Sequence, residues 1–201
     1  MITVLIAYNN DENEKCGHFF EDCATDIRNH CLTHGVDVQL LTPPDLTEEK
    51  FSKQAGTSQI CYIASHGSPN SVVNEKGEDF ISTNTANYSL NGQCFFSVSC
   101  HCAKELKDAL FRIGLKLFVG YNNTYTFFPN CDEFTQSANS GLKAFIEGMS
   151  VAQMKEHIYA EYDRLYKVLD KKSAIMADAL LDNKEAIIVE GEDTLTINDL
   201  V

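Results

Sequence analysis

Three things are scarce or missing in this 201-residue sequence: a long apolar run, a basic leader segment and an excess of positive charge. No stretch reaches the roughly 18 consecutive apolar residues that suggest a transmembrane helix. The apolar start over 2–7 follows no basic segment and precedes no small-residue cleavage site, so we expect no secretion signal, no membrane association and a cytoplasmic location. With 16 Lys and Arg against 29 Asp and Glu, the net charge of -13 argues against direct binding of nucleic acid.

The sequence does contain enough apolar material for one core. Hydrophobic residues make up 44% of the chain, and no linker, repeat or low-complexity tract divides it, so we expect a single domain over 1–201. Eight cysteines are present without a secretion signal, and a chain of this length builds a core without disulfides, so we expect reduced thiols. A reduced thiol can react, so at least one of these cysteines is a candidate for a chemical role.

Short apolar runs alternate with helical patterns along the chain. Strands are predicted over 2–7, 36–41, 59–64, 93–98, 115–120 and, at an edge, 186–190. Helices are predicted over 14–34, 46–53, 103–113, 131–147, 150–169 and 173–181. The polar segment 68–90 is expected to be a long surface excursion with room for a small hairpin. Because parallel neighbours require crossovers, this alternation predicts an α/β fold with a mostly parallel central sheet, helices on both faces and ligands at the carboxyl ends of the strands.

Two predicted strands lead into residues that are capable of chemistry. Strand 59–64 precedes His66-Gly67, and strand 93–98 precedes Cys100. On adjacent parallel strands these side chains would share one rim, where an imidazole activates a thiol and later protonates a leaving amine. Gly67 allows a tight turn whose N–H, with the N–H of Cys100 at a helix N-terminus, would face a developing oxyanion. Taken singly, His66 is better explained as a strand-end histidine that hydrogen-bonds to loop carbonyls, and Cys100 as one buried thiol among eight. Taken together, the two residues favour catalysis.

The segments around this pair resemble the caspase-like cysteine peptidases, and among them the bacterial CHAT-type domains. The resemblance lies in ICYIASHG, QCFFSVSCHCA, LKLFVGYNN and FTQSANSGLKAFIEGMSVAQM, and it extends over residues 1–170. It implies a caspase-like three-layer sandwich and a cysteine endopeptidase without a cofactor. His66 would be the general acid/base, Cys100 the nucleophile, and the amides of Gly67 and Cys100 the oxyanion donors. The substrate would be a protein or peptide, and an activating or sensor protein would bind in trans, in a bacterial immunity or stress pathway such as antiviral defence.

The sequence departs from the family pattern next to the candidate nucleophile. Caspases carry Gln-Ala before the cysteine, where this chain has Val98-Ser99, and many relatives carry Gly two residues after it, where this chain has Cys102. Metacaspase-like relatives carry Asp at the position of Val98, so their preference for basic residues is not transferred. A catalytically silent caspase-like interaction module is therefore the alternative. A flavodoxin-like or receiver-like domain is a weaker one, because the chain lacks a phosphate loop and paired carboxylates after its first strand.

Substrate recognition is expected from the loops 68–90 and 121–131. The aromatic cluster Tyr121, Tyr125, Phe127 and Phe128 is a candidate for an apolar wall, and half of it is expected to serve the core. Asp132 and Glu133 are candidates for an acidic site that selects a basic residue, although both acids also suit the first turn of a helix. Because these polar loops have few residues to bury, we expect that a partner orders them and so activates the enzyme.

The cysteines and histidines form no clean metal motif. Structural zinc sites usually present two closely spaced pairs of ligands. Neither the segment Cys100-His101-Cys102 nor the first predicted helix supplies two such pairs; that helix contains Cys16, Cys23, Cys31, His30 and His34. The helix cysteines fit an apolar stripe, and the two histidines on one helical face are expected to be solvated. We therefore expect no metal.

Overall fold

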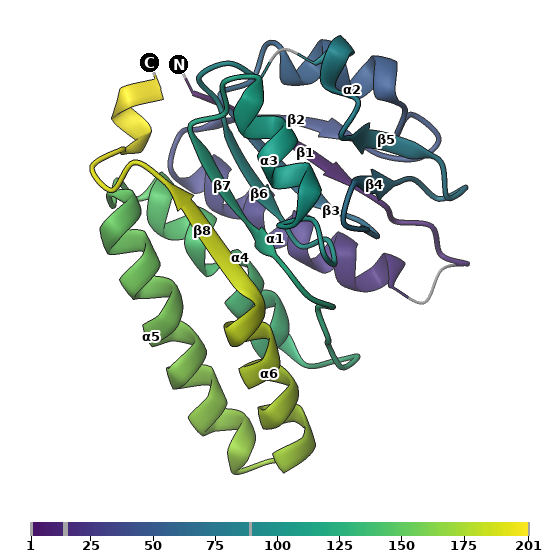
Figure 1. The fold of residues 1–201 in the computed structure, drawn as a ribbon. Coiled ribbons are helices and arrows are strands. Elements are labelled where there is room, and N and C mark those ends of the chain that lie inside the picture. Colours follow the sequence, from purple (N-terminus) through teal and green to yellow (C-terminus); the bar gives the residue numbers. More distant parts are fainter. Residues whose placement is uncertain (1, 14–15, 89, 201) are drawn as a thin grey trace.

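The structure is a computed structural model that describes residues 2–13, 16–88 and 90–200. A six-stranded sheet in the order β2-β1-β3-β6-β7-β8 lies at its centre (Figure 1). Five of its strands run parallel: β1 (Thr3–Tyr8), β2 (Asp37–Leu41), β3 (Ile60–Ala64), β6 (Cys94–Ser97) and β7 (Leu117–Tyr121). Strand β8 (Ile187–Gly191) pairs antiparallel with β7 at the edge. The predicted α/β fold with a mostly parallel sheet is confirmed.

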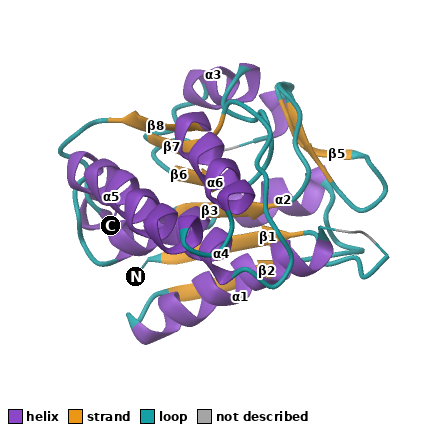
Figure 2. Ribbon diagram, turned by 90° about the horizontal axis from the view of Figure 1, so that it is seen from below, coloured by secondary structure: helices purple, strands orange, loops and turns teal. Residues whose placement is uncertain are grey.

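Helices cover both faces of the sheet and complete a three-layer sandwich (Figure 2). On one face lie α1 (Gly17–Thr33) and α4 (Asp132–Ile146), with α5 (Val151–Asp170) packed against α4 and α6 (Ala174–Ala186) against α5. The other face carries α2 (Glu48–Ala55), α3 (Glu105–Arg112) and the hairpin of β4 (Ser71–Val73) and β5 (Asp79–Ser82). Short 3₁₀ turns occur at η1 (Thr85–Asn87) and η2 (Ile197–Leu200). None of the described helices combines the length and the apolar character needed to cross a membrane.

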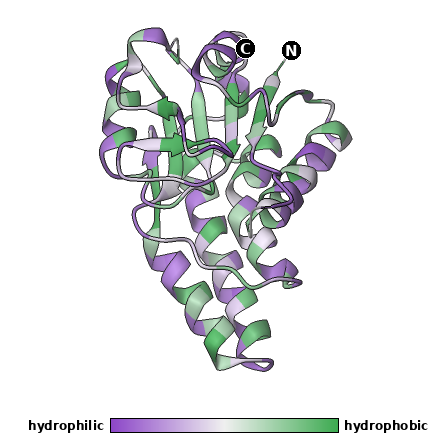
Figure 3. Cartoon of the chain, turned by 90° about the vertical axis from the view of Figure 1, so that its right-hand side faces the viewer, coloured by the Kyte–Doolittle hydropathy of each residue, from purple (hydrophilic) through white to green (hydrophobic). Residues whose placement is uncertain are grey.

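The central strands are apolar on both sides because each side faces a separate core. In β1, Val4 and Ile6 point into the cluster under α1 and α4, whereas Leu5 and Ala7 point into the cluster under α2 and α3. All residues of β3 and β7 are buried. Figure 3 shows the same arrangement, with hydrophobic strands inside and hydrophilic stretches on the outward surfaces of the helices. This two-sided burial explains why the strands appear in the sequence as continuous apolar runs.

The segment 68–90 differs from its prediction. The suggested hairpin is present, but the expectation that this segment buries few of its own residues is wrong. Phe80 and Tyr88 both contact Phe51 of α2 edge-on, with ring centroids 5.9 Å apart in each pair. Val72, Ile81 and Leu90 are likewise buried on this face. These apolar side chains are spaced too irregularly for a helical or strand pattern, so only their tertiary contacts reveal them.

Most other predicted elements shift by a few residues at their ends. The predicted start of the first helix includes Glu14, which lies outside the described residues, and α1 is described from Gly17. Helix α6 continues past the predicted end at 181 to Ala186. The buried Asn183 explains this extension, because its side chain accepts the Thr126 N–H at 2.8 Å and donates to the Thr126 carbonyl at 2.6 Å. A contact with a distant loop therefore stabilises the last turns of the helix.

One polar network joins the sheet to α1 and α4. Asn139 of α4 is fully buried, and its Oδ1 accepts a hydrogen bond of 2.5 Å from the hydroxyl of Tyr62 in β3. Its Nδ2 donates to the Cys23 carbonyl at 3.0 Å and to Asp26 Oδ2 at 2.7 Å, both in α1. A buried amide on α4 that satisfies partners on β3 and α1 fixes how these three elements pack.

We expect Asn139→Ala to lower the free energy of unfolding by about 2–3 kcal/mol, because the buried Tyr62 hydroxyl loses its acceptor and cannot reach water. Urea denaturation monitored by circular dichroism measures this loss. Gln136→Ala, an exposed change on the same helix, is the control and should stay within about 0.5 kcal/mol of the parent. Equal stability of both variants and the parent would contradict the role given to this network.

Candidate active site at the carboxyl edge of the sheet

The strands that precede the candidate residues are neighbours in the sheet. Strands β3 and β6 pair in parallel, with Ile63 opposite Ser97, and the Val98 N–H donates to the Ile63 carbonyl at 2.8 Å. His66 follows β3 and Cys100 follows β6, so both leave the sheet at the same carboxyl edge. The expected adjacency of these two strands is confirmed.

Gly67 lies directly against the backbone of Cys100. A Cβ atom at residue 67 would lie 2.5 Å from the Cys100 carbonyl oxygen, 2.8 Å from Ser99 Cβ and 3.2 Å from the Cys100 nitrogen. The turn that holds Gly67 there is fixed on both sides, since the Ser68 N–H donates to the Ser71 carbonyl and the Val73 N–H donates to the His66 carbonyl. Only a residue without a side chain fits this approach, so the glycine is required by packing.

The two backbone N–H groups assigned to an oxyanion hole are available. Neither the N–H of Gly67 nor that of Cys100 donates to another residue within the described ranges. The expected helix N-terminus at Cys100 is wrong, however, because α3 begins only at Glu105. His101 adopts a positive φ of 60°, and the Lys104 N–H closes a turn onto the His101 carbonyl at 3.1 Å. The left-handed residue prevents a continuous helix, so no helix dipole acts directly at Cys100.

The Cys100 thiol is half-buried and accepts a hydrogen bond from a neighbouring loop. The backbone N–H of Tyr125 donates to Cys100 Sγ at 3.3 Å. Burial raises the pKa of Cys100 above the ordinary thiol value, and the Tyr125 N–H partly opposes this because it stabilises the thiolate. His66 is also half-buried, and its ring contacts Phe20 of α1 edge-on, with centroids 5.3 Å apart. The resting thiol is therefore mainly protonated at neutral pH, and its activation requires a base.

Cys102 is unsuited to be the nucleophile. It is fully buried, and a Cβ on Gly120 would lie 2.9 Å from its Sγ. Burial raises the pKa of Cys102 to about 11. Cys131, half-buried like Cys100, donates its thiol to Glu133 at 3.2 Å and has its pKa raised to about 11 by burial and that carboxylate. Cys100 is thus the half-buried thiol that directly follows β6, at the edge of the sheet where His66 follows β3.

The four residues predicted to bind substrate lie in different surroundings. Tyr121 and Tyr125 are buried in the core, where the Tyr121 hydroxyl bonds to that of Tyr162 at 2.9 Å and the Tyr125 hydroxyl donates to the Phe134 carbonyl at 2.7 Å. They do not form an open apolar wall. Glu133 pairs with Lys172 at 2.5 Å, which lowers its pKa and neutralises its charge. The two tyrosines thus belong to the core half of the predicted aromatic cluster, whereas Phe127 and Phe128 line a cavity. The acidic site stays a prediction.

Asp132 lines a cavity of about 570 Å³ between the start of α1 and the loop before α4. Phe19 and Phe127 stack in its wall with centroids 4.1 Å apart, and Asp22 adds a second carboxylate. The other lining residues are His18, Phe128, Pro129, Asn130, Cys131 and Thr135. Phe19 also stacks against Tyr125, whose N–H reaches Cys100, so the cavity adjoins the rim. Asp22 was missed because nothing in a helical pattern indicates that its exposed face lines a cavity.

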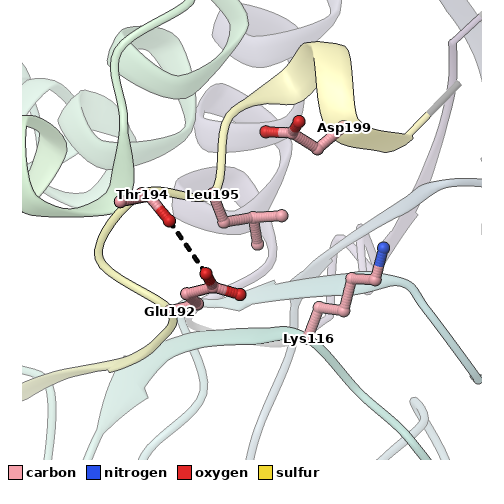
Figure 4. Close-up of a pocket in the computed structure, with 5 residues that line it drawn as sticks. All are labelled: Lys116, Glu192, Thr194, Leu195 and Asp199. Carbon is pink, nitrogen blue, oxygen red and sulfur yellow. Dashed lines mark hydrogen bonds between the residues drawn. The ribbon is translucent and has the colours of Figure 1, made fainter.

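A second cavity lies at the opposite edge of the sheet, where Lys116 precedes β7 (Figure 4). Glu192, Thr194, Leu195 and Asp199 complete its lining, and the Thr194 hydroxyl donates to Glu192 at 2.9 Å. The backbone of this tail caps α5, since the Val151 N–H donates to the Leu195 carbonyl at 3.0 Å. The lining contains no nucleophile and no histidine, so we assign this region to the packing of the C-terminal tail.

The chain matches no protein-family model and no curated protein. The topology alone does not identify the function, because parallel strands in this order occur in several unrelated α/β folds. The functional argument therefore rests on the residues at the carboxyl edge.

We expect iodoacetamide to modify Cys100 well before Cys102, and at a rate that still rises as the pH passes the ordinary thiol pKa of about 8.5. The thiolate is the reacting species, and a raised pKa means that the thiolate fraction is small at neutral pH and grows only on the alkaline side. Peptide mass spectrometry on timed samples across a pH series measures both effects. Faster labelling of Cys102, or a plateau for Cys100 already at neutral pH, would contradict these burial arguments.

Proposed function

We propose that this chain is a cysteine peptidase in which Cys100 is the nucleophile and His66 the general acid/base. The observation that carries the proposal is the parallel β3–β6 pair, which leads both residues to one edge and sets Gly67 against the Cys100 backbone. An accessible thiol, a nearby imidazole and two unengaged backbone N–H groups are the parts that acyl transfer to a thiol needs. The caspase-like resemblance assigns the same residues to the same roles.

The proposed reaction starts from a protonated thiol. His66 accepts the Cys100 proton as Sγ attacks the peptide carbonyl, and the oxyanion of the tetrahedral intermediate accepts hydrogen bonds from the N–H groups of Gly67 and Cys100. His66 then gives the proton to the leaving amine as the C–N bond breaks and a thioester remains. A water molecule, deprotonated by His66, hydrolyses the thioester and restores the thiol. The raised pKa of Cys100 makes the proton transfer part of the attack.

The cavity beside the rim is the proposed site for a substrate side chain. Phe19 and Phe127 supply an apolar wall, and Asp22 and Asp132 supply two carboxylates. Such a lining suits a basic side chain, whose aliphatic stem packs on the rings while its charged end meets the acids. This replaces the predicted pair of Asp132 and Glu133, because the Glu133 charge is matched by Lys172.

The cellular setting belongs to the same proposal. No disulfide joins any of the eight cysteines, and all of them lie in the described part of the chain, which favours a reducing compartment such as the cytoplasm. Activation by a protein in trans stays a prediction, and the loop 68–90 no longer supports it, because that loop packs its own apolar residues. The role in bacterial immunity stays a prediction.

We expect the parent chain to cleave a peptide library when an activating protein encoded beside it is present, with little or no cleavage by the chain alone. Cys100→Ala should abolish cleavage, and His66→Ala should reduce kcat by about 10²–10⁴-fold, the usual contribution of general acid–base catalysis. Gln136→Ala, an exposed change on α4 outside the cavity lining, is the control and should keep kcat. If no condition gives cleavage while Cys100→Ala still binds a partner normally, the silent interaction module replaces the peptidase.

Gly67→Ala should lower kcat by about 10²–10³-fold, the loss typical for one misplaced oxyanion donor, because a methyl group there forces the Cys100 backbone away. Gly56→Ala is the control: it changes a glycine whose added Cβ meets only ordinary contacts, from 3.4 Å outward, and it should keep the parental rate. Circular dichroism verifies that both variants fold. A folded Gly67→Ala variant with parental kcat would show that this turn takes no part in the reaction.

A further inference from the structure

A cluster of metal-binding side chains lies where α1 and α4 both end. His30 is in the last turn of α1, His34 follows the helix as its C-cap, and Glu147 is the C-cap of α4. One nitrogen from each histidine and one carboxylate oxygen all lie within 4.8 Å of one another. The sequence pointed only to the two histidines, because Glu147 is distant in the chain and reaches them through the packing of α4 on α1.

The spacing in this cluster is close to that of a coordinated ion. His30 Nε2 lies 3.5 Å from Glu147 Oε1. Around Zn²⁺, ligand distances of about 2.0–2.1 Å in a tetrahedron place neighbouring ligand atoms about 3.4 Å apart. The two imidazole rings are stacked, with centroids 4.2 Å apart. Small rotations of the exposed side chains of His34 and Glu147 would therefore bring all three atoms onto one ion.

The histidine nitrogens are prepared for a metal. His30 Nε2 is buried from solvent and, within the described residues, has no hydrogen-bond partner, which is an unusual state for a buried polar atom. His34 Nδ1 lies 2.9 Å from the His30 carbonyl, and the neutral tautomer that donates to this carbonyl leaves the Nε2 lone pair for an ion.

The surrounding charges also favour a cation. The C-terminal ends of α1 and α4 both contribute partial negative charge at this place. The nearest positive group, Lys143, is held by Asp26 through an ion pair of 2.7 Å, so its charge is matched. Two imidazoles with one carboxylate suit Zn²⁺ and related transition metals, whereas Mg²⁺ and Ca²⁺ prefer oxygen ligands only.

We propose that His30, His34 and Glu147 form a binding site for a divalent transition-metal ion, Zn²⁺ above all, which clamps the end of α1 to the end of α4. Three protein ligands leave a fourth tetrahedral position for water. A rise of 1.5 Å per residue puts His30 about 15 Å along α1 from Phe20, which contacts His66. The ion is therefore structural and takes no part in the proposed peptidase chemistry.

Calorimetric titration of the metal-stripped full chain with ZnCl₂ tests this site, with His34→Ala and Glu147→Gln as variants of two exposed ligands. The control is His18→Ala, an exposed histidine on the same helix outside the cluster. We expect one Zn²⁺ per parental chain, a loss of affinity of more than about tenfold in each ligand variant, and unchanged binding in the control. Zinc should raise the melting temperature of the parent and the control only.

Cobalt spectroscopy separates this site from the thiols. Co²⁺ bound by imidazole and carboxylate gives weak visible bands, without the strong thiolate charge-transfer band that cysteine ligands produce. Absence of stoichiometric binding, binding that survives both ligand variants, or a thiolate band that depends on Cys100 would each overturn the proposal.

Discussion

The parallel pairing of β3 with β6 is the constraint on which the rest of the site depends. Its hydrogen-bond register fixes where each strand ends, and so brings the two following turns to one edge of the sheet. Gly67 then fits against the Cys100 backbone because it has no side chain. Two further contacts come from outside this strand pair. Phe20 of α1 packs against His66, and the Tyr125 N–H donates to the Cys100 sulfur. If the register moved by one residue, every one of these contacts would be lost.

Burial and hydrogen bonding act on the Cys100 thiol in opposite directions. Burial disfavours the thiolate, and the backbone N–H groups of Tyr125 and of Cys100 itself only partly offset that cost. A helix N-terminus would have stabilised the anion, but the left-handed His101 delays α3 until Glu105. In the proposed reaction, the thiol would therefore need a base at the moment of attack, or a rearrangement that improves the solvation of the sulfur. Under the same proposal, a bound substrate or partner that met either need would control the reaction.

The fold was predictable where local pattern and tertiary environment agree. Strands such as β3, buried on both faces, appear as continuous apolar runs, and their order along the chain predicted a mostly parallel sheet with His66 and Cys100 on one rim. The sequence could not place side chains whose surroundings depend on a residue distant in the chain. Tyr121 turns inward because its hydroxyl meets Tyr162, and Glu133 is neutralised by Lys172 across the α4–α5 layer. No spacing rule in the sequence contains those contacts.

The cluster of His30, His34 and Glu147 is also a feature that the sequence alone does not reveal. Two histidines four residues apart carry little information until packing adds a third ligand. Helix α4 reaches α1 through the buried Asn139, which bonds to both α1 and β3. This polar contact in the core therefore joins the sheet to α1 and α4, and the ends of these two helices carry the surface cluster.

The central claim is that Cys100 and His66 act together on a peptide carbonyl. Its most direct test is covalent capture by a peptidyl acyloxymethyl ketone, compared with simple alkylation by iodoacetamide, using mass spectrometry to locate each adduct. The account predicts ketone capture at Cys100 in the parent chain, lost in His66→Ala although iodoacetamide still labels Cys100 there. Ketone capture that does not depend on His66, or that occurs at another thiol, would contradict it.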